Sequence, residues 1–307
     1  MDQKIIATIG AFDGVHVGHQ DLFAQMRHYA DRYLSARLLI LTFVPYPADV
    51  LSPSGRQHID PVQRHLEHLA QIEGFELVPM TFSEELASHS AETFLREVLR
   101  DQLHVTDLFL GYDNRFGAGA RLSFEEYQAL GAQYGIEVLQ ADSLSLEGEV
   151  VSSTWIKACI SRGEMREAYR ALGRPYAVFG TVITGQQLGR RLGYPTANIR
   201  REDPDQLLPP DGVYACDLEL HRPSGEAEKH HAMLYIGKRP TLGGELERTI
   251  EVHILDFDEM IYGMEVAVHI FEQLHPERRF ASTEELRTAL AAYEADTRRY
   301  FAENTRY

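Results

Sequence analysis

Hydrophobic and polar positions follow two different rhythms along the chain. In the first half, short apolar runs alternate with segments of helical spacing. The run at 4–10, for example, precedes 18–34, where Leu22, Met26 and Tyr29 fall on one helical face. The later apolar runs and helical segments of this half are 36–43, 61–72, 83–103, 105–112, 123–135 and 136–141. Such strand–helix alternation predicts a parallel sheet with helices on both faces.

The rhythm changes after Gly173, where strand-type patterns replace the alternation. Alternating apolar and polar residues are separated by Gly and Pro turns, and one long helical pattern at 282–301 closes the sequence. The strand-type segments are 176–184, 212–220, 231–237, 248–257 and 265–274. This texture predicts a small barrel or sandwich. We therefore expect two domains, residues 1–172 and 173–307.

Composition and charge narrow the range of functions. The 307 residues carry a formal net charge of −16 at pH 7, so we expect no nucleic-acid partner, because phosphate backbones require basic surface. Cys159 and Cys216 lack a metal-binding or disulfide-framework spacing, which fits a reducing compartment. No apolar run reaches membrane-spanning length, and the chain starts in a strand-like run. We expect a cytoplasmic protein with no membrane partner; the oligomeric state stays open.

Two histidines stand in the segment IGAFDGVHVGH, which joins the first predicted strand to the first helix. The helix start offers free N–H groups and partial positive charge, which suit a phosphate group. His16 and His19 can donate hydrogen bonds to phosphate oxygens as negative charge builds on them. The residues alone leave three interpretations open: a nucleotide-triphosphate site, two polar histidines in a loop, or a metal pair, for which no third ligand lies at suitable spacing.

The first half resembles the nucleotidyltransferase family whose signature is HxGH after the first strand, here HVGH. FDGVHVGH is similar to the adenylyltransferase domain of bacterial bifunctional riboflavin kinase/FAD synthetases. Further segments that resemble it, in the same order, are LTFVPYPADVL, GYDNRFGAGA and VSSTWIK. The resemblance implies a Rossmann-like FMN adenylyltransferase domain over residues 1–172, which converts FMN and ATP to FAD and pyrophosphate.

The resemblance also implies roles for individual residues. His16 and His19 would stabilise the transition state, and Asn114 would place the flavin nucleotide or its phosphate. The residues expected to bind ATP and its phosphates are Gly10, Phe12, Gly18, Ser153, Thr154 and Lys157. Without that resemblance, VSSTWIK would be an ordinary capped helix start.

Four positions depart from the family pattern. The family usually has Asn, His, Arg and Arg where this chain has Ala11, Tyr46, Trp155 and Lys157. Lysine keeps the positive charge but loses the bidentate fork of arginine. These departures affect how tightly the first domain is expected to bind pyrophosphate, and therefore the expected rate of its adenylyl transfer.

A glycine-rich segment, GTVITGQQLGRRLGYPTANI, opens the second half. Gly185, Gly189 and Arg190 suit the approach of a phosphate, although the P-loop pattern GxxxxGK[ST] is absent. In an extended PTAN segment, Thr196 and Asn198 point the same way, so their oxygens can share one Mg²⁺. The plain alternative is that both side chains satisfy a turn.

The segment TIEVHIL adds a carboxylate. Ile250, Val252 and Ile254 fall on one strand face, and Glu251 and His253 fall on the other. Most glutamates in such positions are simply solvated, so the pattern alone assigns no chemistry.

Together these segments resemble riboflavin kinase, a six-stranded antiparallel Greek-key barrel with a C-terminal helix. The resemblance implies that Thr196 and Asn198 bind Mg²⁺ with ATP, and that Glu251 is the general base on the riboflavin 5′-hydroxyl. The expected ATP-phosphate contacts are Gly185, Gly189 and Arg190. FEQLHPERRF resembles a late family segment in which arginine is usual at the position of His275, and we assign His275 no role.

The leading hypothesis is a two-domain enzyme whose partners are small-molecule nucleotides and flavins. It would phosphorylate riboflavin to FMN with ATP and then adenylylate FMN to FAD. One alternative is an active riboflavin kinase with a weakened transferase domain. The other is a non-catalytic flavin-nucleotide binder, which would not require both a base and a pair of metal ligands.

Overall fold

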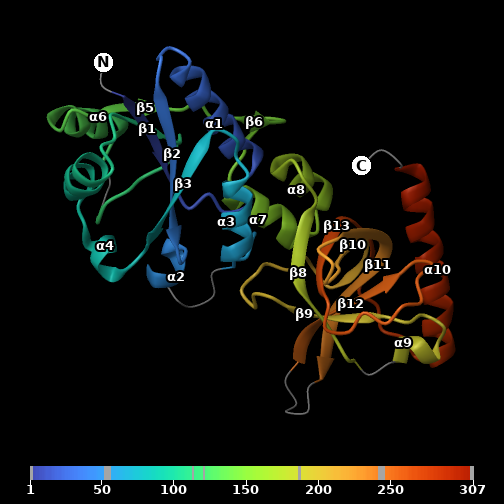
Figure 1. Cartoon of the computed structure of the whole chain (residues 1–307). Coiled ribbons are helices and arrows are strands. Elements are labelled where there is room, and N and C mark those ends of the chain that lie inside the picture. Colours follow the sequence, from blue (N-terminus) through green and yellow to red (C-terminus); the bar gives the residue numbers. More distant parts are fainter. Residues whose placement is uncertain are drawn as a thin grey trace. The chain divides into compact units, whose positions relative to one another are not determined.

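The chain divides into two compact units. The structure is a computed structural model that describes residues 3–51, 57–112, 114–119, 122–185, 188–240 and 246–304. The first unit holds Met1–Gln57 and Val62–Ser153, and the second holds His58–Pro61 and Thr154–Tyr307. Figure 1 shows a sheet flanked by helices in the first unit and a barrel in the second.

A five-stranded parallel sheet forms the centre of the first unit, in the order β3-β2-β1-β4-β5. The strands are β1 (Lys4–Ile9), β2 (Ala36–Val44), β3 (Phe75–Thr81), β4 (Asp107–Leu110) and β5 (Glu137–Gln140). The strand order reverses between β1 and β4, which makes that point the topological switch. Ligands of such sheets bind beyond the carboxyl ends of the strands at this place.

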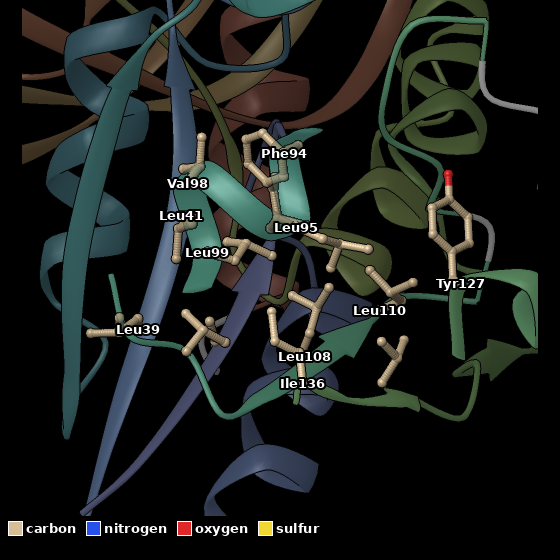
Figure 2. Close-up of a cluster of buried hydrophobic side chains, with 14 of the residues drawn as sticks. Leu39, Leu41, Phe94, Leu95, Val98, Leu99, Leu108, Leu110, Tyr127 and Ile136 are labelled. Atoms are coloured by element: carbon tan, nitrogen blue, oxygen red, sulfur yellow. The ribbon is translucent and has the colours of Figure 1, made fainter. Parts of the chain in front are cut away.

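Helices cover both faces of the sheet, as the alternating pattern predicts. On one face, α1 (Val17–Ala30) and α3 (Val62–Ala70) contribute Phe23, Met26 and Leu69 to the core. The opposite face is covered by the π-helical η1 (Phe94–Gln102) and by α6 (Phe124–Gln133), and Figure 2 shows that core. Successive residues of one strand feed opposite cores, since side chains alternate along a strand.

The helical pattern at 83–103 forms three pieces instead of one helix. α4 (Glu84–Ser88) begins after its N-cap Ser83, but His89 then takes an extended conformation. Ser90 caps a new start, from which α5 (Ala91–Thr93) runs into η1. Ser83 and Ser90 each accept a backbone N–H from three residues ahead, and this local bonding divides the segment.

The edge strand β3 is absent from the sequence pattern because Pro79 interrupts it. Proline lacks the N–H that a ladder needs, so it is tolerated at a sheet edge. The remaining short elements of the first unit are α2 (Pro47–Leu51), β6 (Ser145–Leu146) and β7 (Glu149–Val150).

The second unit is built on a closed antiparallel barrel in the order β10-β11-β12-β9-β8-β13 (Figure 1). Its strands are β8 (Tyr176–Ile183), β9 (Ala197–Arg201), β10 (Gly212–His221), β11 (Ala227–Pro240), β12 (Leu246–Ile254) and β13 (Glu265–Pro276). The PTAN segment supplies the sixth strand, β9. The short α9 (Leu188–Arg191) precedes it, and α10 (Thr283–Glu303) packs on β10, β11 and β13.

Two helices follow β7 in the sequence, and all their residues except Ser153 belong to the second unit. α7 (Ser153–Arg162) and α8 (Met165–Leu172) are separated at Gly163, whose φ of 77° ends the first helix. α8 packs on β8 and β13, so the compact units divide after Ser153. The boundary expected at 172, between the catalytic domains, stays a prediction.

No helix in the described part of the chain has both the length and the apolar character needed to cross a bilayer.

Candidate active sites

The first candidate site lies at the switch point of the parallel sheet. The loop between β1 and α1 ends at His16, the first turn of α1 carries His19, and the loop after β4 carries Asn114. Three residues of the first loop have left-handed backbone conformations: Phe12, Gly14 and Val15 have φ angles of 47°, 83° and 41°. Left-handed backbone at non-glycine residues costs free energy and is concentrated at functional sites.

His16 is part of the helix start itself. It is the N-cap of α1, and its Nδ1 accepts the backbone N–H of His19 at 3.3 Å. An Nδ1 that accepts this bond carries no hydrogen, so the neutral imidazole bears its hydrogen on Nε2. His16 therefore combines a structural acceptor with a donor on the other side of the ring.

The two imidazoles stack on each other, with ring centroids 3.5 Å apart and planes inclined by 20°. Burial lowers the pKa of His16 to about 4. Burial also lowers the pKa of His19 well below its ordinary value, and the neighbouring imidazoles of His16 and His65 add to this effect. Both rings are therefore neutral at pH 7.

Glycines leave the space that these rings occupy. A Cβ atom on Gly18 would lie 3.2 Å from Nδ1 of His16 and 3.2 Å from the carbonyl oxygen of Val151. A Cβ atom on Gly10 would lie 3.0 Å from the ring of Phe12, which in turn meets His19 edge-on at 5.1 Å. The expected residues Gly10, Phe12 and Gly18 thus shape the histidine pair.

The start of α7 meets the same loop. Ser153 donates its hydroxyl hydrogen to the carbonyl oxygen of Asp13 at 2.8 Å. Thr154 and Lys157 follow on α7 in the second unit, where Thr154 is exposed and Lys157 half-buried. The structure therefore brings Ser153 to the histidine loop, while the phosphate contacts of Thr154 and Lys157 stay predictions.

Asn114 connects two strand ends. Its Nδ2 donates to the carbonyl oxygen of Ile9, the last residue of β1, and its backbone N–H donates to Gly111 at 3.1 Å. The side chain thereby fixes the loop after β4 to the start of the histidine loop, across the switch point.

A further buried histidine, His65 on α3, has no counterpart in the sequence analysis. Its Nε2 lies 3.1 Å from the hydroxyl oxygen of Thr42 on β2, and its ring lies 5.3 Å from that of Tyr46. It is close enough to His19 to affect the pKa of that residue. The one sequence signal that points to His65 is Tyr46, which stands where the family usually has histidine and whose ring contacts His65.

The second candidate site lies where β9 and β12 meet in the barrel. Asn198 and Glu251 are direct partners in the antiparallel ladder. The hydroxyl of Thr196 donates to Oε2 of Glu251 at 3.2 Å, and Glu251 is only 7% exposed. Three predicted residues from segments 55 positions apart are thus brought together.

The glycine loop packs directly on these side chains. A Cβ atom on Gly185 would overlap the carboxamide of Asn198. A Cβ atom on Gly189 would overlap the carbonyl group of Tyr194 and would lie 3.3 Å from Oγ1 of Thr196. A side chain at Gly185 would therefore collide with Asn198, and a side chain at Gly189 would collide with the backbone of Tyr194.

Two cavities flank Thr196. One, of about 260 Å³, is lined by Arg190, Thr196 and the 257–262 segment. The other, of about 270 Å³, is lined by Thr196, Glu251 and His253. The two faces of β12 line different cavities, as the alternation of TIEVHIL predicts.

Aromatic and apolar side chains form most of the second cavity. They come from the barrel, from the 276–280 segment and from the inner face of α10, and are Leu192, Tyr194, Tyr235, Phe280, Leu286, Leu290 and Tyr293. These residues occupy positions whose periodicity is typical of an ordinary hydrophobic core, so the sequence pattern alone did not predict the cavity. His275, to which no role was assigned, lies 2.9 Å from Asp296 and 4.3 Å from the ring of Tyr293.

Comparisons with known proteins agree with both halves. The FAD synthetase family model matches residues 1–155, and the riboflavin kinase model matches residues 172–301. Bifunctional riboflavin kinase/FMN adenylyltransferases of Haemophilus influenzae and Listeria monocytogenes are 33% and 34% identical to the chain. These alignments cover 94% and 98% of this chain and 91% and 94% of the relatives.

A solved structure shares the whole fold. The crystal structure described as a macrolide-efflux protein from Streptococcus pneumoniae superposes with a TM-score of 0.82 at 31% identity. The match covers 97% of this chain and 95% of that one.

Fold and sites define a nucleotide-dependent transferase with two separate centres, one on a parallel sheet and one in a barrel. The chain belongs to the family of bifunctional riboflavin kinase/FMN adenylyltransferases.

The neutral state of His16 gives a testable pH dependence. Its pKa is about 4 in the folded chain and near the ordinary 6.5 when unfolded, so the unfolded chain binds more protons between these values. The stabilisation is complete above pH 6.5 and is lost as the pH falls toward 4. From pH 7 to 4.5, the free energy of unfolding should fall by about 2 kcal/mol more in the unsubstituted chain than in His16→Asn.

Asparagine keeps the N-cap but does not titrate, which makes it the matched control. Urea unfolding followed by circular dichroism at a series of pH values measures the difference. Identical pH slopes for the two chains would contradict the buried, neutral state of His16.

Proposed function

We propose that the barrel phosphorylates riboflavin to FMN with ATP, and that the parallel-sheet domain adenylylates FMN with a second ATP to give FAD. The observation that carries the proposal is the position of Thr196, which lines both barrel cavities and donates a hydrogen bond to Glu251. Group transfer between two bound molecules requires that both be held side by side with the catalytic base next to them, and two cavities that share Thr196, which contacts Glu251, suit this requirement.

The two barrel cavities suit different substrates. The cavity with Arg190 takes the nucleotide, because its guanidinium can neutralise phosphate charge. The cavity with Tyr194, Phe280 and Tyr293 takes riboflavin, because a flat aromatic ring system packs well on aromatic and aliphatic walls. This places the hydroxyl group that reacts near Glu251.

Glu251 supplies the base in the kinase reaction. Its carboxylate accepts the proton of the riboflavin 5′-hydroxyl, the oxygen then bonds to the γ-phosphorus of ATP, and the bond to ADP breaks. Thr196 orients the carboxylate through its hydrogen bond to Oε2. The remaining carboxylate oxygen, Oε1, is buried in the same site.

The oxygen atoms of this site fit Mg²⁺. Thr196 and Asn198 offer a hydroxyl and a carboxamide oxygen, and Gly185 provides the cradle that a Cβ atom would fill. Few protein oxygens together with substrate phosphates are the usual surroundings of this ion. When bound, Mg²⁺ would neutralise phosphate charge; Thr196 and Asn198 are the residues that would hold it.

The first site needs no protein nucleophile and no base. The phosphate of FMN is already anionic; it attacks the α-phosphorus of ATP, and pyrophosphate leaves. His16 and His19 donate hydrogen bonds to the oxygens on which charge develops, beside the N–H groups of α1. Ser153, Thr154 and Lys157 hold the leaving phosphates, and Asn114 positions the loop that receives FMN.

Replacing Glu251 tests the kinase assignment. Glu251→Gln should slow FMN formation by roughly 10²- to 10⁴-fold, the usual contribution of a general base, and should leave FAD formation from supplied FMN unchanged. Glu265→Gln alters an exposed glutamate of β13 and is the control. Chromatography of the flavins measures both products; a joint loss of both activities would refute the assignment of Glu251 to the kinase.

The two histidines test the transferase assignment. Changing His16 and His19 together to Ala should abolish FAD formation while FMN still accumulates from riboflavin, because only the first site loses its donors. His28→Ala alters an exposed histidine on the same helix and should change neither product. Continued FAD production by the double variant would remove both imidazoles from the mechanism.

A further inference from the structure

His253 lies beside the proposed base without a role in the reaction described above. It follows Glu251 by two residues on β12, so both side chains leave the same face of the strand. It is 8% exposed and lines the same cavity as Glu251 and Thr196. A buried polar ring in a substrate cavity requires a partner.

That partner is the carbonyl oxygen of Pro195, which lies 2.8 Å from Nδ1 of His253. A carbonyl oxygen can only accept, so Nδ1 bears the hydrogen and donates it. The ring also meets the ring of Tyr194 edge-on, with centroids 5.6 Å apart. The imidazole is thus hydrogen-bonded to the backbone of the residue that precedes Thr196.

The hydrogen bond from His253 lies just beyond the last described pair of the β9–β12 ladder. Along the described strands, β9 pairs with β12 at Ile199, Asn198 and Ala197, and the recorded pairing stops there. In the same register, the next position of β12 opposite Thr196 is His253. Its side chain holds Pro195 at the point where the described ladder has ended.

We propose that His253 is a positioning residue for the phosphorylation of riboflavin. It holds the carbonyl of Pro195, while Glu251 on the same strand face receives the hydroxyl of Thr196. The two bonds fix the backbone and the side chain of the 195–196 turn independently. The Thr196 hydroxyl is thereby kept on the base and between the two cavities; this inference rests on the proposed kinase function.

Three substitutions separate hydrogen bonding from packing. His253→Asn places an amide N–H near the position of Nδ1, His253→Gln places one near Nε2, and His253→Phe keeps a ring with no donor. Positioning through Nδ1 predicts that Asn preserves kcat for FMN formation, whereas Phe and Gln lower it by about 10²-fold, the scale of a misplaced catalytic group. The KM for riboflavin should change much less than kcat.

The opposite ranking would overturn the proposal. If Phe retains full activity, the ring acts by packing alone; if Asn is as damaged as Phe, an N–H group at the position of Nδ1 is not sufficient and the proposal fails. If Phe fails to fold by circular dichroism, the comparison of Asn with Gln decides: equal activities of these two contradict the assignment. FAD formation from FMN should be unchanged in all folded variants.

The pH profile of kcat distinguishes positioning from proton transfer. Because His253 does not exchange a proton in this account, His253→Asn should keep the profile of the unsubstituted enzyme. A displaced acid limb in that variant would show that His253 itself titrates in the reaction, which contradicts a positioning role. An unsubstituted enzyme that makes no FMN would refute the kinase function instead, so the two failures are distinguishable.

Discussion

The absence of a Cβ atom at a few glycines is the constraint on which both sites depend. At Gly18 the space beside the backbone is taken by the imidazole of His16, and at Gly185 it is taken by the carboxamide of Asn198. Because protein interiors are closely packed, a methyl group added at these positions must displace the neighbouring atoms, which costs free energy. These glycines therefore leave room for polar side chains of both candidate sites.

The two centres differ because their nucleophiles differ. In the proposed transferase reaction the phosphate of FMN is already ionised and needs no base, and the donors proposed for the parallel-sheet site are neutral, because burial lowers the pKa of His16 to about 4. In the proposed kinase reaction a flavin hydroxyl must lose its proton, and the carboxylate proposed to accept it is that of Glu251, which receives a hydrogen bond from Thr196. An acidic chain can thus handle polyphosphates through local donors and glycine cradles rather than through a basic surface.

Local pattern predicted the elements and residues that depend on neighbours in sequence. The alternation of strands and helices and the opposite faces of Glu251 and Val252 follow from periodicity. Features that depend on distant contacts were missed. Pro79 hides an edge strand that is stabilised only by β2, and His65 reaches the first site from a helix whose pattern shows no functional signal. The aromatic wall of the cavity beside Glu251 is formed by residues whose sequence pattern is that of an ordinary core.

Single methyl groups give the most direct test of the claim that glycine contacts hold two independent centres. FMN and FAD formation should be measured separately, by chromatography, in Gly18→Ala and Gly185→Ala, with circular dichroism confirming that each variant folds. The account predicts that Gly18→Ala lowers only FAD formation from FMN and that Gly185→Ala lowers only FMN formation from riboflavin. Retention of both activities in both variants, or a joint loss in either folded variant, would contradict it.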